Sequence, residues 1–315
     1  MPKISVIIPT FNRANLLERA IRSVLSQTYR HFEIIVVDDA STDNTQEMLK
    51  EKFAPEIDAG VLRYIRNEKN IERSRSRNKG MEMARGEYIA LLDDDDFWFP
   101  DHIAILLDYL NRKPAVGIVY SNHISLYENG FAEIGIKGIR SGEGDYYRNL
   151  CFRRVLAHNS IHLFRKSAYY HLGGLNTDIT YGEDREFFSR IAMNYDVGYI
   201  ASVTGCIYAH SGTYSTKKTL EDHAYFKENV WKIIEENSKK YSYPLSSETK
   251  ADAYLFLSNC FLPNLKKTRE YFLKAVIMDY KILCRLNIWV LLLRILIGKR
   301  IYLSLKNIKA KLMCC

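Results

Sequence analysis

The chain has 315 residues, of which 47% are hydrophobic and 26% are charged. That balance is ordinary for a globular protein and excludes a disordered chain, a collagen-like fibre and a disulfide scaffold. No apolar stretch approaches the ~20 uncharged residues of a membrane-spanning helix, and the start, MPKISVIIPT, lacks the features of a secretory signal. We therefore expect a cytoplasmic protein whose six cysteines are thiols, neither zinc ligands nor disulfides.

Basic residues are concentrated toward the C-terminal end. The net charge is +8, yet residues 264–315 alone carry twelve Lys and Arg against Glu270 and Asp279. The rest of the chain is therefore close to neutral. A near-neutral body with a basic tail predicts that the tail meets an anionic surface, and it argues against a body that binds nucleic acid.

The first ~120 residues alternate short apolar runs with segments of helical periodicity. The predicted strands are 4–8 (ended by Pro9), 32–37, 61–65, 88–92 and 116–120, and the predicted helices between them are 16–25, 74–84 and 100–110. This alternation predicts an α/β fold with a mostly parallel sheet covered by helices. In such sheets ligands bind beyond the carboxyl ends of the strands.

The pattern changes after residue 120. Residues 121–150 have little periodicity and are predicted to form loops over the site; a helix is expected at 185–193 and a strand at 197–209. From about residue 220 the pattern is helical. We therefore expect a catalytic domain over residues 1–215 and a helical, basic region over residues 216–315.

Polar clusters follow three of the predicted strands, at Thr10–Arg13, Asp38–Asp39 and Asp93–Asp96. Four consecutive aspartates destabilise a fold unless a cation neutralises them, and carboxylate oxygens suit Mg²⁺ or Mn²⁺. The alternative for this run is an acidic helix start favoured by the helix dipole. For Asp38–Asp39 the alternatives are a nucleotide contact or a helix N-cap.

Other candidates lie farther along the chain. Four basic residues of one predicted helix, Arg73, Arg75, Arg77 and Lys79, do not share a face, so one or two of them could bind phosphate and the others would be solvated. Glu183 or Asp184 could act as a general base or be surface acid at a helix start. His210 ends an apolar strand and is either a metal ligand or a histidine with only structural contacts.

Together these segments resemble glycosyltransferase family 2, the inverting, nucleotide-sugar-dependent enzymes of the GT-A fold. The resemblance rests on ISVIIPTFNR, FEIIVVDDASTDNT, SRSRNKGMEMARGEYIALLDDDDFW and GGLNTDITYGEDREFFSRIA, which follow the family's pattern in order and spacing. It covers about residues 3–212, two thirds of the chain.

The resemblance implies a role for each matching residue. The residues that would contact the nucleobase and ribose are Thr10, Asn12, Arg13 and Asp39. Arg77 would face the donor diphosphate. Asp93 and Asp95 would be the DXD ligands of Mn²⁺ or Mg²⁺. Asp94 would lie between them in the donor site, and Asp96 would be close by. His210 would be a further metal or diphosphate contact. Asp184 would be the catalytic base, and Glu183 would help to position the acceptor.

The implied activity is the inverting transfer of a sugar from a nucleotide-diphosphate donor, expected to be a UDP-sugar. The acceptor would be a hydroxyl of a lipid-linked or growing glycan in cell-surface polysaccharide biosynthesis. Two alternatives are a catalytically silent member that binds nucleotide without turnover and a sugar nucleotidyltransferase. The second would need a glycine-rich, basic phosphate loop near the N-terminus, which PTFNRAN does not supply.

An apolar block, IWVLLLRILI at residues 288–297, lies among the basic residues of the tail. It is too short to cross a bilayer but resembles an interfacial helix on anionic lipid at the inner face of the cell membrane. The alternative is a helical hairpin that packs on its own neighbours. A polyprenyl-linked acceptor would favour the membrane interpretation.

Overall fold

The structure is a computed structural model of the whole chain, and it describes residues 3–135, 142–143, 158–180, 182–211, 219–262 and 264–284. The chain divides into two compact units, Met1–Thr216 and Lys217–Cys315. The predicted apolar block at 288–297 and most of the basic tail lie outside the described residues, as do residues 136–141 and 144–150 of the predicted loop region.

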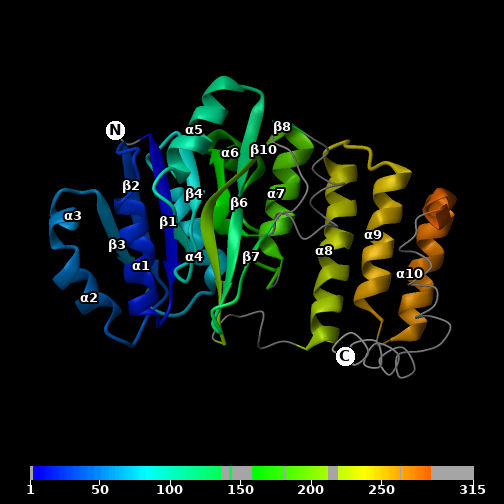
Figure 1. Cartoon of the computed structure of the whole chain (residues 1–315), viewed down its shortest axis with the longest axis horizontal. Helices are drawn as coiled ribbons and strands as arrows, with labels where there is room; N and C mark the ends of the chain where they lie inside the picture. The colour runs from blue at the N-terminus through cyan, green and yellow to red at the C-terminus, as the bar shows by residue number, and fades with distance from the viewer. Residues whose placement is uncertain are drawn as a thin grey trace, which may run out of the picture. The chain divides into compact units, whose positions relative to one another are not determined.

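The first unit alternates strands and helices along the chain (Figure 1). Its strands are β1 (Ile4–Thr10), β2 (Phe32–Asp38), β3 (Leu62–Arg66), β4 (Tyr88–Leu91), β5 (Phe97–Trp98), β6 (Val116–Tyr127), β7 (Ala132–Ile134), β8 (Gly142–Glu143), β9 (His162–Arg165) and β10 (Asp196–Ala209). Its helices are α1 (Ala14–Leu25), α2 (Thr45–Lys52), α3 (Ala54–Asp58), α4 (Arg73–Glu82), α5 (His102–Arg112), the short 3-10 helix η2 (Asn159–Ile161), α6 (Lys166–Leu172) and α7 (Glu183–Asn194).

All these strands belong to one sheet of order β3-β2-β1-β4-β9-β6-β10-β5, with β7 beside β6 and β8 beside β10. The pairs β1–β2, β1–β4, β2–β3 and β6–β10 are parallel. Strand β9 lies antiparallel to both β4 and β6 and so joins two parallel groups. The predicted α/β fold is confirmed, and the sheet is mixed because a later segment is inserted between β4 and β6.

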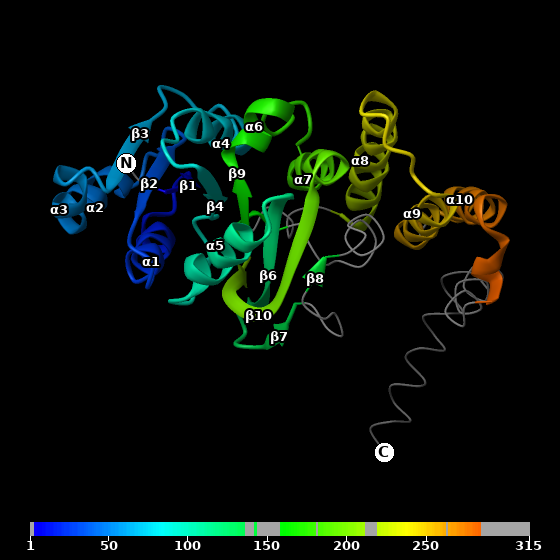
Figure 2. The same cartoon turned by 90° about the horizontal axis from the view of Figure 1, so that it is seen from above.

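Helices cover both faces of this sheet (Figure 2). Alternate residues of β1, such as Ile4, Val6 and Ile8, pack in one core with residues of α1 and α5. On the opposite face α4 approaches β1 so closely that a Cβ on Gly80 would lie 2.3 Å from Ile7 Cγ2. Burial on both faces explains why β1 and β2 are nearly continuous apolar runs rich in β-branched residues.

Most boundaries lie within two residues of the sequence prediction, and two of the differences have a clear structural reason. Strand β1 continues through Pro9 to Thr10 in its pairing with β2. Pro9, which has no N–H to donate, is tolerated because the pairing of β1 with β4 on the other side ends at Ile7. Residues 121–127 are not loop: they prolong β6, which pairs with β10 as far as Tyr127. Their long-range pairing could not be read from local periodicity.

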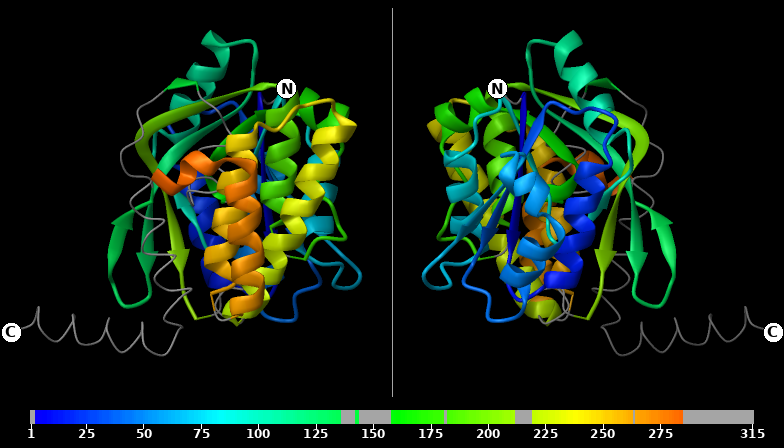
Figure 3. Two further views of the ribbon diagram at one scale, coloured as in Figure 1. Left: turned by 90° about the vertical axis from the view of Figure 1, so that its right-hand side faces the viewer. Right: turned by 90° about the vertical axis from the view of Figure 1, so that its left-hand side faces the viewer.

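The second unit is helical, with α8 (Leu220–Lys240), α9 (Ser247–Cys260), α10 (Leu265–Met278) and the 3-10 helix η4 (Tyr280–Cys284). The three long helices pack side by side (Figure 3). Glu228 of α8 accepts hydrogen bonds from Lys267 and Tyr271 of α10, each at 2.5 Å. Among the described residues, no helix has the length and apolar character needed to cross a membrane.

Candidate active site

The turn after β4 holds the four consecutive aspartates, and it is fixed from several sides. The backbone N–H of Asp96 donates to the carbonyl oxygen of Asp93 at 3.0 Å, which closes the turn. Asp94, Asp95 and Asp96 are all buried, at 5%, 8% and 4% exposure. Buried carboxylates are unfavourable without partners, so the contacts of each one determine what it can do.

Asp94 points toward the end of β1 and the start of α1. Its carboxylate accepts hydrogen bonds from Thr10 Oγ1 at 2.8 Å and from Arg13 Nη1 at 2.9 Å. Burial raises the pKa of Asp94 to about 7, although the Arg13 guanidinium opposes the shift. Arg13 Nη1 also donates to Asp95 Oδ2 at 2.9 Å. Thr10, Arg13 and Asp94, three of the predicted donor residues, therefore form one hydrogen-bonded group.

Asp96 is held by η2 and β10. Ser160 Oγ donates to Asp96 Oδ2 at 2.5 Å and accepts from the backbone N–H of Asp93 at 3.0 Å. The backbone N–H of Tyr208 donates to the other oxygen of Asp96 at 2.9 Å. Burial, together with the charges of Asp95 and Asp93, holds the pKa of Asp96 well above its ordinary value.

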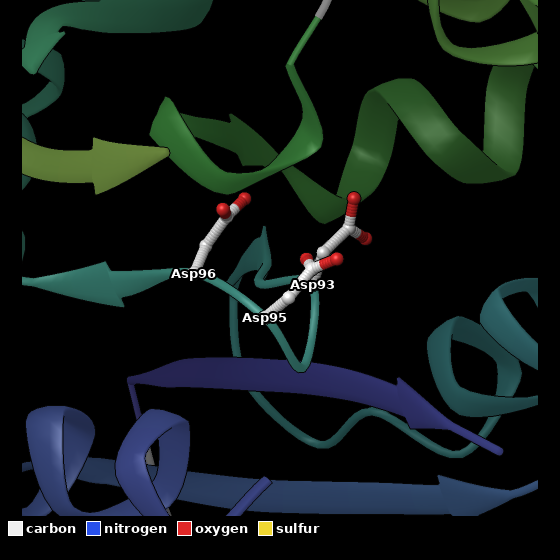
Figure 4. A group of neighbouring side chains, drawn as sticks. All are labelled: Asp93, Asp95 and Asp96. Atoms are coloured by element: carbon white, nitrogen blue, oxygen red, sulfur yellow. The ribbon is translucent and has the colours of Figure 1, made fainter. Parts of the chain in front are cut away.

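Asp93, Asp95 and Asp96 can bind a metal ion together. Each offers one oxygen, and the three oxygens lie within 4.8 Å of one another, with the side chains gathered on the same side of the turn (Figure 4). His210 lies next to this group, since its Nε2 is 3.2 Å from Asp95 Oδ2. Three carboxylates match the preference of Mn²⁺ and Mg²⁺ for oxygen ligands. Burial and the charges of Asp95 and Asp93, which raise the pKa of Asp96, would favour a bound cation, although Arg13 and Arg77 already offset part of the negative charge.

Asn12 and Asp39 belong to the loops beside this turn. Asn12 has a left-handed backbone, with φ of 55°, and its side-chain oxygen accepts from the backbone N–H of Thr42 at 2.7 Å. Asp39 is buried, and its Oδ1 accepts from Asn67 Nδ2 and from the backbone N–H of Ile71, both at 2.9 Å. These hydrogen bonds join the ends of β1, β2 and β3 into one edge.

Helix α7 begins directly at the predicted acidic pair. Gly182 has the left-handed conformation that glycine adopts easily, with φ of 84°, and Glu183 is the first helical residue. Asp184 is half-buried, and its Oδ1 accepts from the backbone N–H of Arg185 at 2.7 Å. Burial and the neighbouring charge of Glu183 raise the pKa of Asp184 to about 7, a value suited to a general base.

Two arginines of α4 contact the start of α7. Arg77 Nη1 donates to Glu183 Oε1 at 3.0 Å, and Arg77 Nη2 donates to Asp93 Oδ1 at 2.5 Å. Arg73 Nε lies 3.2 Å from Glu183 Oε1. Arg75, on the same helix, is exposed, whereas Lys79 Nζ donates to Asn67 Oδ1 at 2.7 Å, so three of the four basic residues contact this edge where one or two were expected.

The structure thus brings most of the predicted site residues to the carboxyl edge of β1, β2 and β4 and to the start of α7. Nothing in the sequence indicates Ser160, whose partners lie more than sixty positions earlier. The same is true of Arg19, which donates to the carbonyl oxygen of Asp95 and lies over the rings of Phe97 and Tyr208. A single serine or arginine carries no local pattern that would mark such a contact.

Comparison with protein families gives a match over residues 5–173 to the model described as glycosyl transferase family 2. A glycosyl transferase of Escherichia coli K12, WcaA, whose name assigns it to colanic acid biosynthesis, is 26% identical over 248 residues; the match covers 76% of this chain and 85% of WcaA. The Campylobacter jejuni GalNAc(5)-diNAcBac-PP-undecaprenol beta-1,3-glucosyltransferase is 39% identical over 114 residues, which is 36% of each chain.

Solved structures show the same fold. Residues 1–349 of Staphylococcus aureus TarS, in complex with UDP-GlcNAc, superpose with a TM-score of 0.68 at 17% identity, covering 87% of this chain and 79% of that one. The mannosyltransferase PcManGT from Pyrobaculum calidifontis, in complex with GDP-Man and Mn²⁺, gives a TM-score of 0.61 at 19% identity, covering 100% and 81%. At these identities the likeness concerns the fold, which is GT-A.

Proposed function

Since this chain belongs to glycosyl transferase family 2, we propose that it transfers a sugar from a nucleoside-diphosphate donor, expected to be a UDP-sugar, with inversion at the anomeric carbon. The observation that carries this proposal is that Arg77 joins the turn with the three clustered carboxylates, through Asp93, to Glu183 at the start of α7. The next residue, Asp184, is half-buried and has a pKa raised to about 7. The acceptor is a hydroxyl of a lipid-linked or growing glycan in cell-surface polysaccharide biosynthesis. The names of WcaA and of the Campylobacter enzyme support that choice.

Thr10, Asn12, Arg13 and Asp39 form the nucleotide end of the proposed donor site. Their contacts with Asp94, Thr42, Asn67 and Ile71 shape the loops that would receive the base and ribose. An acidic residue after a strand can accept from a ribose hydroxyl or a base N–H. Asp39 Oδ1 already accepts two hydrogen bonds, so Oδ2 is the oxygen that would accept from the nucleotide.

Asp93, Asp95, Asp96 and His210 are the proposed ligands of a divalent cation. When bound, Mn²⁺ or Mg²⁺ would supply positive charge to the leaving nucleoside diphosphate. Within the chain itself, Arg13 holds Asp94 and Asp95 together, and Ser160 holds Asp93 and Asp96. These contacts fix the carboxylates before any ligand arrives, which is the kind of preorganisation that makes electrostatic stabilisation effective.

Asp184 is the proposed general base. It accepts the proton of the acceptor hydroxyl while that oxygen forms a bond to C1 of the donor sugar. The bond between C1 and the diphosphate oxygen breaks, and the nucleoside diphosphate leaves with the electron pair. One displacement of this kind inverts the anomeric centre.

We also propose that the C-terminal region contacts an anionic membrane surface at the inner face of the cell membrane. The support comes from α10 and η4: Leu273 and Ile277, four residues apart on α10, are 60% and 69% exposed, and Tyr280 at the start of η4 is 71% exposed. Lys266, Arg269 and Lys281 are exposed on the same segment. Exposed apolar residues flanked by basic ones are typical of interfacial helices.

Sedimentation with vesicles tests this second proposal. The protein should sediment with vesicles containing phosphatidylglycerol and not with phosphatidylcholine alone, and Ile277→Asp should weaken binding. The matched control is Phe131→Asp, which changes an apolar side chain of the first unit that is 57% exposed. Equal binding of the wild type to both kinds of vesicle would contradict the proposal. So would an Ile277→Asp protein that binds like the wild type, or an equal loss of vesicle binding in Ile277→Asp and Phe131→Asp.

Thermal stabilisation tests the primary proposal, because a ligand that binds the folded state raises the melting temperature by mass action. UDP, GDP and their sugar conjugates are compared with and without Mn²⁺, and release of UDP from the donor is then followed for those that bind. We expect a metal-dependent shift with UDP or a UDP-sugar. Binding without any turnover would favour a catalytically silent member, and no shift with any nucleotide would overturn the proposed donor site.

A further inference from the structure

Arg77 is a buried cation held between two acidic elements of the site. Its side chain is 3% exposed, and its two terminal nitrogens each donate to a carboxylate, one to Glu183 and one to Asp93. Asp93 opens the turn after β4, and Glu183 opens α7. The arginine therefore joins the proposed metal-binding turn to the helix that carries the proposed base.

The charges around Arg77 keep it ionised, so that it can link the turn after β4 to the start of α7. Burial acts to lower the pKa of Arg77, but the charges of Asp93 and Glu183 outweigh it and raise the pKa above its ordinary value. The N–H groups of a guanidinium point in fixed directions, so the two hydrogen bonds restrict the orientation of both carboxylates as well as neutralising charge. Removing one member would leave a buried charge without its partner, which is strongly unfavourable.

Other side chains of α4 hold the segment that leads into α7. Asn78 Nδ2 donates to the carbonyl oxygen of Leu175 at 2.9 Å, and Asn78 Oδ1 accepts from the backbone N–H of Leu175 at 2.8 Å. Arg73 Nη2 donates to the carbonyl oxygen of Thr180 at 3.0 Å. Helix α4 thus contacts the chain at 175, 180 and 183, just before Asp184.

Helix α4 is itself a firm support for these contacts. Gly80 allows it to lie against the sheet, because a Cβ there would be 2.3 Å from Ile7 Cγ2 and 3.2 Å from Val37 Cγ2. Ile7 and Val37 belong to the central strands β1 and β2, which end at the proposed nucleotide site. The start of α7 is therefore anchored, through α4, to the same strands that position the donor.

We propose that Arg77 is a positioning residue that sets Asp184 relative to the donor turn, and that it does not bind the donor diphosphate. This inference rests on the proposed function, since it assigns Asp184 as the base. The guanidinium donates through its two terminal nitrogens to Glu183 and Asp93, and its Nε is buried. The side chain is only 3% exposed, which leaves little surface for a diphosphate that arrives from solvent. Asn78 assists by fixing the chain that precedes α7.

The test compares Arg77→Lys, Asn78→Ala and the matched control Arg75→Lys, which lies on the same helix but is exposed. Three quantities are measured: the Kd of UDP in the presence of Mn²⁺, the kcat of UDP release from the donor, and hydrogen exchange of residues 175–190 without ligand. We expect Arg77→Lys and Asn78→Ala to lower kcat by up to about 10²-fold, as small misplacements of a reacting group do. The Kd of UDP, measured at a Mn²⁺ concentration that saturates each variant, should stay within about threefold, because neither side chain contacts the donor. Loss of a direct charge-assisted hydrogen bond to the diphosphate would instead raise this Kd about tenfold or more.

Hydrogen exchange gives a readout that does not depend on activity. Amides of 175–190 should exchange faster in Arg77→Lys and in Asn78→Ala than in the wild type, whereas Arg75→Lys should match the wild type in all three measurements. A rise of about tenfold or more in the Kd of UDP, with exchange unchanged, would overturn the inference and make Arg77 a diphosphate ligand. Unchanged kcat in both variants would overturn it as well. A wild-type protein that neither binds UDP nor releases it would instead refute the proposed function.

Discussion

The two acidic groups of the site differ in how tightly the protein holds them. In the turn after β4, Asp94, Asp95 and Asp96 receive hydrogen bonds from β1, α1, η2 and β10. Asp184, at the start of α7, accepts its hydrogen bond from the backbone of the next residue, Arg185. The donor-side carboxylates are thus held directly by distant parts of the chain. The Asp184 carboxylate accepts its hydrogen bond within its own helix, and the distant Arg77 acts only through the start of that helix.

This difference matches what each group has to do. Metal ligands must keep a set geometry against their mutual repulsion, so contacts from several elements are needed. A general base must instead reach a proton on an incoming substrate, and a carboxylate with few partners is better suited to that. Substitutions in the donor-side turn and at Asp184 should therefore have different consequences.

The largest effect is expected for Asp184→Asn. Because the amide cannot accept the proton, UDP release should fall by about 10²–10⁴-fold, the usual contribution of a general base. The carboxylate has a raised pKa, so the folded state binds its proton more tightly than the unfolded state, and at pH 8 the ionised group lowers stability. The melting temperature at pH 8 should therefore not fall.

Asp108→Asn, at an exposed position of α5 paired with Arg112, is the matched control and should change neither turnover nor melting temperature appreciably. If Asp184→Asn kept the activity of the wild type, the assignment of the base would be wrong. If it lost activity together with stability, Asp184 would be part of the fixed framework, and the contrast between the two groups would disappear.

A smaller effect is expected for Ser160→Ala. This variant removes the hydroxyl that donates to Asp96 and accepts from the N–H of Asp93, so both ends of the turn lose a partner. Mn²⁺ affinity, measured by calorimetry, should fall by about 10–100-fold, as it does when other outer partners of metal ligands are removed. Ser258→Ala removes an equally buried hydroxyl of α9 and should leave Mn²⁺ affinity unchanged. Equal Mn²⁺ affinity in wild type and Ser160→Ala would show that the turn does not need this support.

The smallest effect concerns pH. Asp184 must be ionised to accept a proton, so with its pKa raised to about 7, kcat/KM should fall as the pH drops below about 7 and level off above it. Burial and Glu183 cause the shift, and Glu183→Gln removes the second cause. The acid limb of the pH profile should then move to lower pH. A limb that stays in place, or moves to higher pH, would show that another group limits the rate.

Much of the fold could be predicted because its determinants are local. The apolar runs of β1, β2 and β4 and the periodicity of α1 and α5 depend on neighbours within a few residues. The antiparallel place of β9 could not be predicted, because it depends on pairing between His162–Arg165 and strands more than forty residues earlier. The same reason explains the extension of β6 beyond residue 120.

The candidate site likewise contains residues that the sequence indicates and residues that it does not. Asp93–Asp96, Glu183 and Asp184 stand out in the sequence because acidic residues directly after a strand or at a helix start form a visible pattern. The hydrogen bonds of Ser160 and the burial of Arg77 do not, since each depends on which distant segments meet. The sequence therefore indicates which groups are present, while the structure describes how they are held.

The most direct test of this contrast is a titration with UDP in the presence of Mn²⁺. It compares Asp95→Asn and Asp184→Asn with the wild type in one series. Asp95→Asn should lose most of the metal-dependent affinity, because it changes a carboxylate of the three-aspartate group. Asp184→Asn should bind as the wild type does while failing to release UDP from the donor. If Asp184→Asn lost affinity as Asp95→Asn does, or if Asp95→Asn bound normally, the division between a fixed donor group and a separate base would be contradicted.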